Sequence, residues 1–116
     1  MEIKRQDLDT YTVLSVEGPI MIGESTEKLE RALSDLLDDG VRTILIDFSG
    51  VNYIDSTGLG ELVGFLERIR HREGKLALVN PQDRILQLLK ISGLDKVFPI
   101  YSDLDTAIQS VNSSSS

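Results

Sequence analysis

The alternation of apolar and polar positions divides the chain into strand-like and helix-like stretches. Residues 2–9 and 11–17, which are followed by a Gly-Pro pair, predict two strands joined by a short polar turn. Residues 43–48 form an almost continuous run of apolar and β-branched side chains, as is typical of a strand covered on both faces. We therefore expect 43–48 to be the central strand of a sheet.

Apolar residues spaced three and four positions apart predict four amphipathic helices. The stretches with this spacing are 29–37, 59–69, 85–89 and 104–111. A glycine follows each of the first three, and glycine is common just after the last turn of a helix. Two short apolar stretches, 76–79 and 97–100, predict further strands. Pro99 favours an edge position for the last strand, because proline has no amide hydrogen for the ladder.

In the second of these helices, one stripe of apolar side chains is expected to be buried. The stripe consists of Leu59, Leu62, Val63, Leu66 and Ile69. Phe65 falls outside the stripe and is expected at its margin, and Gly64 is expected to allow close helix packing. Met21 and Ile22 are interpreted as an exposed apolar loop, and Leu59 as an anchor for a partner.

The element order β-β-α-β-α-β-α-β-α predicts one α/β domain over residues 1–112. Strands separated by helices need crossover connections, so the sheet of four to five strands should be mixed and mostly parallel. The serine run at 113–116 has low complexity and is interpreted as a disordered tail.

The composition narrows the classes of function. The chain of 116 residues is 41% hydrophobic and 27% charged, with no long apolar segment, so we expect a globular protein without a transmembrane helix. The N-terminus has no apolar core of a secretory signal, which makes the cytoplasm the expected location. The 19 acidic and 12 basic residues give a net charge of -7, which argues against nucleic acid and anionic membranes and favours a protein partner.

Candidate catalytic and metal-binding groups are few. The absence of cysteine excludes a disulfide framework, a thiolate metal site and a thiol nucleophile. The single histidine, His71, is flanked by charges at a predicted helix end and is interpreted as a solvated cation. We therefore expect no catalytic residue, no metal site and no cofactor.

The start of the second helix departs from the usual capping pattern. Asp55, Ser56 and Thr57 can each cap it, but no carboxylate stands where it would close a capping box. Gly58 and Gly60 each cost about 1 kcal/mol relative to alanine in a helix. Such a start favours backbone amides that are free to bind an anion, and a helix backbone that a partner can approach closely. A plain capping role for the hydroxyls stays open.

The segment Ile54-Asp55-Ser56-Thr57-Gly58-Leu59-Gly60, between an apolar strand and a helix, resembles the signature of STAS-domain proteins. Among these it is most similar to the bacterial anti-sigma-factor antagonists. The resemblance extends over residues 1–111 and includes Ile91-Ser92-Gly93-Leu94. It implies a phosphorylated serine directly after the aspartate, which is Ser56, with Thr57 as the second choice.

The resemblance also implies partner switching. The unphosphorylated antagonist binds an anti-sigma factor that is itself a serine kinase, and so releases a sigma factor. Phosphorylation of the serine ends binding, and a metal-dependent serine phosphatase reverses it, so the domain is a substrate and switch and not an enzyme. The partner-binding residues expected here are Asp55, Ser56, Thr57, Gly58, Leu59, Gly60, Met21, Gly23 and Glu24.

One segment departs from the family pattern. Antagonists commonly carry an aspartate in a pattern like Gly-Glu-Leu-Asp, whereas this chain has Gly18-Pro19-Ile20-Met21. Met21 stands at the aspartate position, unless Glu24 takes its role through a shifted loop. Two alternatives stay open: a STAS scaffold or stressosome-type module not switched at Ser56, and a receiver-like phospho-accepting domain. The receiver would need an acidic cluster for Mg²⁺ and a lysine after the last strand, and neither is evident.

Overall fold

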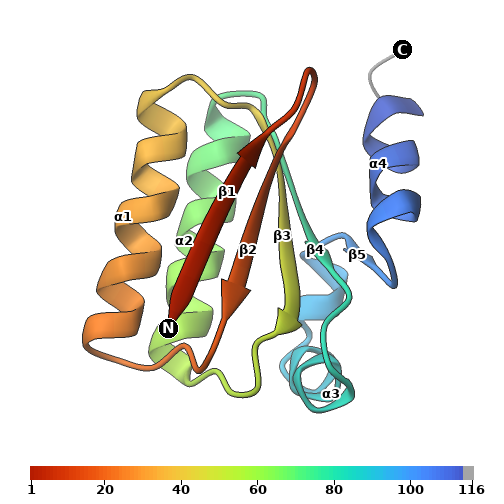
Figure 1. Ribbon diagram of the computed structural model, residues 1–116. Coiled ribbons are helices and arrows are strands. Elements are labelled where there is room, and N and C mark those ends of the chain that lie inside the picture. The colour runs from red at the N-terminus through yellow and green to blue at the C-terminus, as the bar shows by residue number, and fades with distance from the viewer. Residues whose placement is uncertain (114–116) are drawn as a thin grey trace.

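The computed structural model describes residues 1–113, which form five strands, four α-helices and one short 3₁₀-helix. The elements are β1 (Glu2–Asp7), β2 (Thr12–Glu17), α1 (Glu24–Asp38), β3 (Thr43–Gly50), α2 (Ser56–His71), β4 (Lys75–Val79), α3 (Asp83–Ile91), η1 (Leu94–Lys96), β5 (Ile100–Tyr101) and α4 (Leu104–Ser113). This order of strands and α-helices is the predicted one, and the chain is a single α/β domain (Figure 1).

The sheet has the strand order β1-β2-β3-β4-β5, so β3 is central as predicted. β1 is antiparallel to β2, to which a tight turn connects it, and the amide of Leu8 donates to the carbonyl of Tyr11 at 2.8 Å in that turn. The other neighbouring strands are parallel, because a helix crosses over between each pair. The sheet is therefore mixed and mostly parallel.

Helices cover both faces of the sheet, with α1 and α2 side by side on one face and α4 on the other (Figure 1). Successive side chains of β3 alternate between these faces. Ile44, Ile46 and Phe48 belong to the core under α1 and α2, and Leu45 to the smaller core under α4. All four are fully buried, which explains why the strand is apolar from Ile44 to Phe48 except at Asp47, which is half-buried.

The carboxyl ends of β2, β3 and β4 lie at the same end of the sheet, because these strands are parallel. The loop to α1 and the starts of α2 and α3 follow these strand ends directly. The side-chain amide of Gln82 donates to the carbonyl of Ser49 at 2.9 Å, which holds the start of α3 against the end of β3. The topology thus brings three segments that are distant in the sequence together at this end of the sheet.

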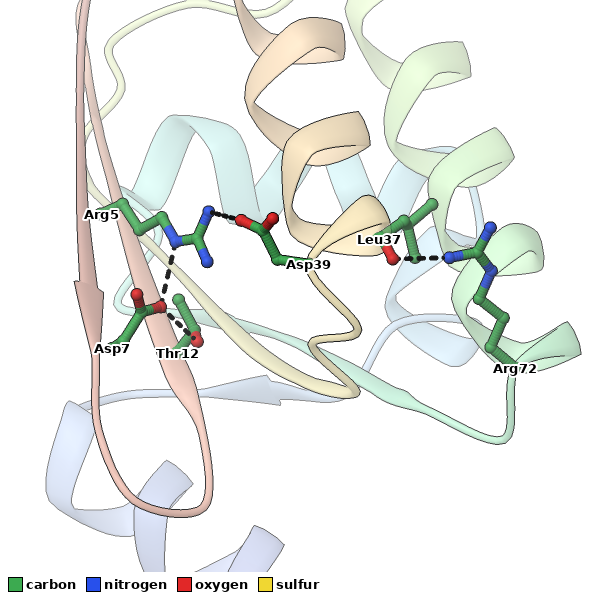
Figure 2. A network of polar contacts seen from close by, with 6 residues as sticks. All are labelled: Arg5, Asp7, Thr12, Leu37, Asp39 and Arg72. Carbon is green, nitrogen blue, oxygen red and sulfur yellow. Dashed lines mark hydrogen bonds and ion pairs between the residues drawn. The ribbon is translucent and has the colours of Figure 1, made fainter.

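At the opposite end of the sheet, polar contacts connect neighbouring elements (Figure 2). Arg5 on β1 binds Asp7 at 3.0 Å and Asp39, just after α1, at 2.7 Å. The hydroxyl of Thr12 donates to Asp7 at 2.9 Å. Arg72, after the end of α2, donates to the carbonyl of Leu37 in the last turn of α1 at 2.7 Å. These contacts fix the ends of α1 and α2 relative to each other and to the sheet.

The last strand is displaced from its predicted range. It was expected at 97–100, but β5 comprises Ile100 and Tyr101 and lies at the sheet edge. Val97 follows η1, and Phe98 is buried in the main core instead of pairing in the sheet. Pro99 precedes the strand, where its carbonyl accepts a hydrogen bond from the amide of Leu78 at 2.9 Å. The apolar run therefore reflects core packing more than strand pairing.

Two expectations for α2 were wrong. Phe65 is only 2% exposed and belongs to the main core, because α2 packs against both α1 and the sheet and so buries a wider face than one stripe. An added Cβ at Gly64 would meet no atom within 4 Å, so this glycine does not serve helix packing.

The C-terminal helix α4 ends at Ser113, the first residue of the expected tail, and residues 114–116 lie outside the described residues. Within residues 1–113, no helix combines the length and the apolar character that crossing a membrane requires.

Candidate functional site

Asp55 caps α2 and joins two loops. Its Oδ1 accepts a hydrogen bond from the amide of Gly58 at 2.8 Å, and its Oδ2 accepts one from the amide of Ile22 at 2.9 Å. The backbone adds to this connection, since the amide of Asp55 donates to the carbonyl of Ile20 at 3.1 Å. The loop before α1 therefore lies against the start of α2.

These hydrogen bonds set the electrostatics of the site. The backbone amides of Gly58 and, to a smaller extent, Ile22 lower the pKa of Asp55, because they stabilise the charged carboxylate. Asp55 is thus an ionised cap at neutral pH. Of the three residues that the sequence left as candidate caps, the aspartate fills this role.

Ser56 and Thr57 are the first two residues of α2, and both are exposed. Neither hydroxyl makes a hydrogen bond within residues 1–113, whereas Asp55 already caps the helix. Ser56 also borders a groove on the surface. Its hydroxyl is consequently accessible to a reagent or a partner.

The two glycines at the helix start have different roles. A Cβ at Gly58 would lie 2.7 Å from Cγ2 of Ile20 and 2.9 Å from Cγ1 of Ile54, so this glycine permits the close approach of the neighbouring loop. A Cβ at Gly60 would meet nothing within 4 Å. Packing within the chain therefore accounts for Gly58, whereas the surface at Gly60 is open.

The loop before α1 presents apolar side chains beside Asp55. Met21 is 43% exposed and Ile22 is 74% exposed, which confirms the predicted apolar loop. Gly23 has φ 113° at the N-cap of α1, in the region that favours glycine, and its amide donates to the hydroxyl of Thr26 at 3.1 Å. Glu24 follows as the exposed first residue of α1. The structure thus brings this loop to the start of α2, as the predicted binding set requires.

A groove of about 620 Å³ lies between the start of α2 and the helix α3. It is lined by Tyr53, Ile54, Asp55, Ser56, Leu59, Arg84, Ile85, Gln87, Leu88 and Ile91. Tyr53 is 47% and Ile91 78% exposed, so the groove has an apolar rim as well as an apolar floor. Leu59, the predicted anchor, packs against the core and also lines the groove.

Sequence reasoning did not find the contribution of α3 to this site. Arg84, Leu88 and Ile91 are spaced four and three residues apart, which places them on one helix face. That spacing was the available signal. Only the tertiary arrangement shows that this face borders Ser56.

The other candidate groups stand apart from this site. His71 is exposed in the last turn of α2, as expected. Among the described residues, no group of three or more His, Asp or Glu side chains has the arrangement to hold a metal ion.

Comparison with known proteins relates this chain to a family. The model of the STAS domain matches residues 1–107. A Listeria monocytogenes protein named anti-sigma-B factor antagonist is 35% identical over 101 residues, which are 86% of this chain and 86% of that protein.

Solved structures agree with this relationship. An anti-sigma factor antagonist from Mycobacterium paratuberculosis has a TM-score of 0.83 and 30% identity, with 96% of this chain and 93% of that chain covered. The Bacillus cell fate determinant SpoIIAA in its phosphorylated form has a TM-score of 0.74 and 21% identity, with 95% and 99% covered. The SpoIIAA comparison shows a shared fold.

Proposed function

The chain belongs to the STAS-domain family, and we propose that it acts as an anti-sigma factor antagonist that phosphorylation of Ser56 switches off. One observation carries the proposal: Ser56 is exposed, no described residue bonds its hydroxyl, and it borders an apolar groove at the capped start of α2. The names of the relatives from Listeria and Mycobacterium support the same function.

The unphosphorylated form binds its partner through the surface around Ser56. Partner-binding residues are those expected from the sequence, Asp55, Ser56, Thr57, Gly58, Leu59, Gly60, Met21, Gly23 and Glu24, together with the groove residues Tyr53, Leu88 and Ile91. The exposed apolar side chains supply contact area, and the open surface at Gly60 lets the partner approach the helix backbone.

Phosphorylation changes this surface without unfolding the domain. A phosphate on Ser56 carries a charge of about -1.5 to -2 at the positive end of the α2 dipole, where an anion is tolerated. A partner that covers the groove must then remove water from this dianion, which weakens binding. SpoIIAA, which shares the fold, is itself known in a phosphorylated form.

The partner is an anti-sigma factor with serine kinase activity. It transfers the γ-phosphoryl group of ATP to Oγ of Ser56, with release of ADP and of the hydroxyl proton to solvent. A metal-dependent serine phosphatase restores the hydroxyl by hydrolysis. The domain is a cytoplasmic binding protein and a substrate; it has no catalytic residue or cofactor of its own and binds neither nucleic acid nor membrane.

The loop before α1 decides which kinase is recognised. Met21 is exposed at the position where related antagonists commonly carry an acidic residue. Glu24 is exposed three residues later, and the Ile22–Asp55 hydrogen bond holds this loop against α2. The loop offers an apolar contact at Met21 and an acidic one at Glu24, so the partner has a matching apolar and basic surface.

The proposal is tested with Ser56→Ala and Ser56→Asp variants as baits in extract of cells that carry the gene. We expect the Ala variant to retain an ATP-binding kinase and the Asp variant to bind it at least tenfold more weakly. Ser102→Asp, an exposed serine between β5 and α4, is the matched charge control and should bind like wild type.

The purified kinase then separates the switch from the scaffold alternative. With ATP it should add one phosphoryl group to the wild-type chain and none to Ser56→Ala, as measured by intact mass. If both baits retain the same large assembly and no kinase modifies Ser56, the domain is a scaffold module and the proposed switch is wrong.

A further inference from the structure

Arg84 lies in the first turn of α3 and lines the same groove as Ser56. It is exposed, and its guanidinium makes no ion pair or hydrogen bond with any of residues 1–113. Arginine presents planar, paired donors that match the oxygens of a phosphate. The side chain is long and flexible, so it can turn toward a group at the start of α2.

The fold accounts for this juxtaposition. α2 follows β3 and α3 follows β4. These two strands are parallel neighbours, so both helices begin at the same end of the sheet (Figure 1). The hydrogen bond from Gln82 to the carbonyl of Ser49 fixes the residues just before Arg84. The position of Arg84 relative to the groove therefore depends on a regular part of the fold.

The charges of the groove leave Arg84 available. Of the described residues that line it, Asp55 and Arg84 are charged. Both carboxylate oxygens of Asp55 already accept backbone amides, those of Gly58 and Ile22. No ion pair within the described residues joins Asp55 to Arg84, although the chain as a whole has a net charge of -7.

We propose that Arg84 binds the phosphate of phosphorylated Ser56 across the groove. The inference rests on the proposed function, because it assumes that Ser56 is the phosphorylated residue. Ser56, Arg84, Leu59 and Leu88 line the same groove, so a partner that contacts the two leucines has to displace an ion pair formed across it. Arg84 thus makes the phosphorylated form a poorer binding partner than a phosphate alone would.

The test uses protein with phosphoserine incorporated at position 56 during translation, so the result does not depend on any kinase. The second pKa of the phosphate, ordinarily about 6, is measured by ³¹P NMR titration. A nearby guanidinium favours the dianion and lowers this pKa. We expect Arg84→Gln to raise it by about half a unit or more, less at high salt, and Arg84→Lys to keep it low.

Lys90→Gln is the matched control, since Lys90 is on the same helix but lines a different hollow, with Leu86 and Phe98. It should leave the phosphate pKa as in wild type. Equal values for wild type and Arg84→Gln, or equal shifts for Arg84→Gln and Lys90→Gln, overturn the proposal. A failure of the switch itself would appear instead as unchanged partner binding by Ser56→Asp.

Discussion

Asp55 and Ser56 are adjacent residues that divide two roles at the start of α2. The carboxylate satisfies amides from its own helix and from a loop 33 residues earlier. The hydroxyl makes no hydrogen bond within the described part of the chain. Because the aspartate is the cap, Ser56 can be modified without loss of the hydrogen bonds that hold the site together.

Replacing Asp55 should weaken the fold in two steps. Asn has one acceptor oxygen where Asp has two, so it can keep the hydrogen bond from Gly58 but loses the one from Ile22, whereas Ala loses both. We expect the melting temperature at pH 7 to fall by a few degrees for Asp55→Asn and by more for Asp55→Ala, measured by thermal denaturation.

The same variants test how the contribution of Asp55 to stability depends on pH. The pKa of Asp55 is lowered in the fold, so its contribution is present above the unfolded value of about 3.9 and is lost as the pH falls through the folded value. The difference in melting temperature between wild type and Asp55→Asn should therefore become smaller at acid pH. A gap of the same size at neutral pH and well below the folded pKa would contradict this assignment.

Gly58→Ala and Gly60→Ala should have opposite effects. Ile20, which the new Cβ at position 58 would meet, is fully buried and cannot move aside, so we expect a loss of about 1–3 kcal/mol. At position 60 the space is open, and alanine should stabilise the helix by up to about 1 kcal/mol. Urea denaturation measures both, and a destabilised Gly60→Ala would show that this surface is not open.

At the scale of elements, the candidate surface is assembled from three segments: the loop before α1, the start of α2 and one face of α3. Each is short, and none forms a groove by itself. Ile22 and Ile91 are the most exposed of the large apolar side chains in the described structure, and they come from two of these segments. Their exposure costs the free protein little stability, because they are not part of the core.

We expect Ile22→Ser and Ile91→Ser to weaken binding of the purified partner by about tenfold each, as anchors at an interface do. Stability should change by no more than about 0.5 kcal/mol, because both side chains are exposed. Leu8→Ser, in the turn between β1 and β2 at the other end of the sheet, is the control and should leave affinity unchanged. Isothermal titration calorimetry measures the affinities, and wild-type affinity in both variants would exclude this surface.

At the scale of the whole molecule, one end of the sheet carries the candidate site and the other end carries polar contacts between elements. Arg5 joins the edge strand β1 to the residue after α1 (Figure 2). Hydrogen bonds from Arg5 and then Thr12 lower the pKa of Asp7. These polar contacts between elements therefore lie away from the candidate site.

Arg5→Gln should lower the melting temperature slightly at low salt, since exposed ion pairs contribute little. The difference from wild type should shrink between about 0.05 M and about 1 M NaCl, because salt screens exposed charges. Partner affinity should stay the same, since Arg5 is at the far end. A loss of affinity in this variant would show that the two ends are coupled.

The sequence by itself determined the order of elements, the central position of β3, the exposed loop at Met21 and Ile22, and a helix start within residues 55–57. These features follow from periodicity and local residue preferences, which act over a few neighbouring residues. The short signature after β3 also indicated the family, because it combines a strand end, a cap and glycines within seven residues.

Only the tertiary structure decided which side chain caps α2, why Gly58 has no side chain, and that Arg84, Leu88 and Ile91 border Ser56. It also buried Phe65 and placed Phe98 in the core rather than in the last strand. Each of these outcomes depends on segments that lie far apart in the chain. Such segments meet only through the strand order and the crossovers of the sheet, and local patterns do not encode these contacts.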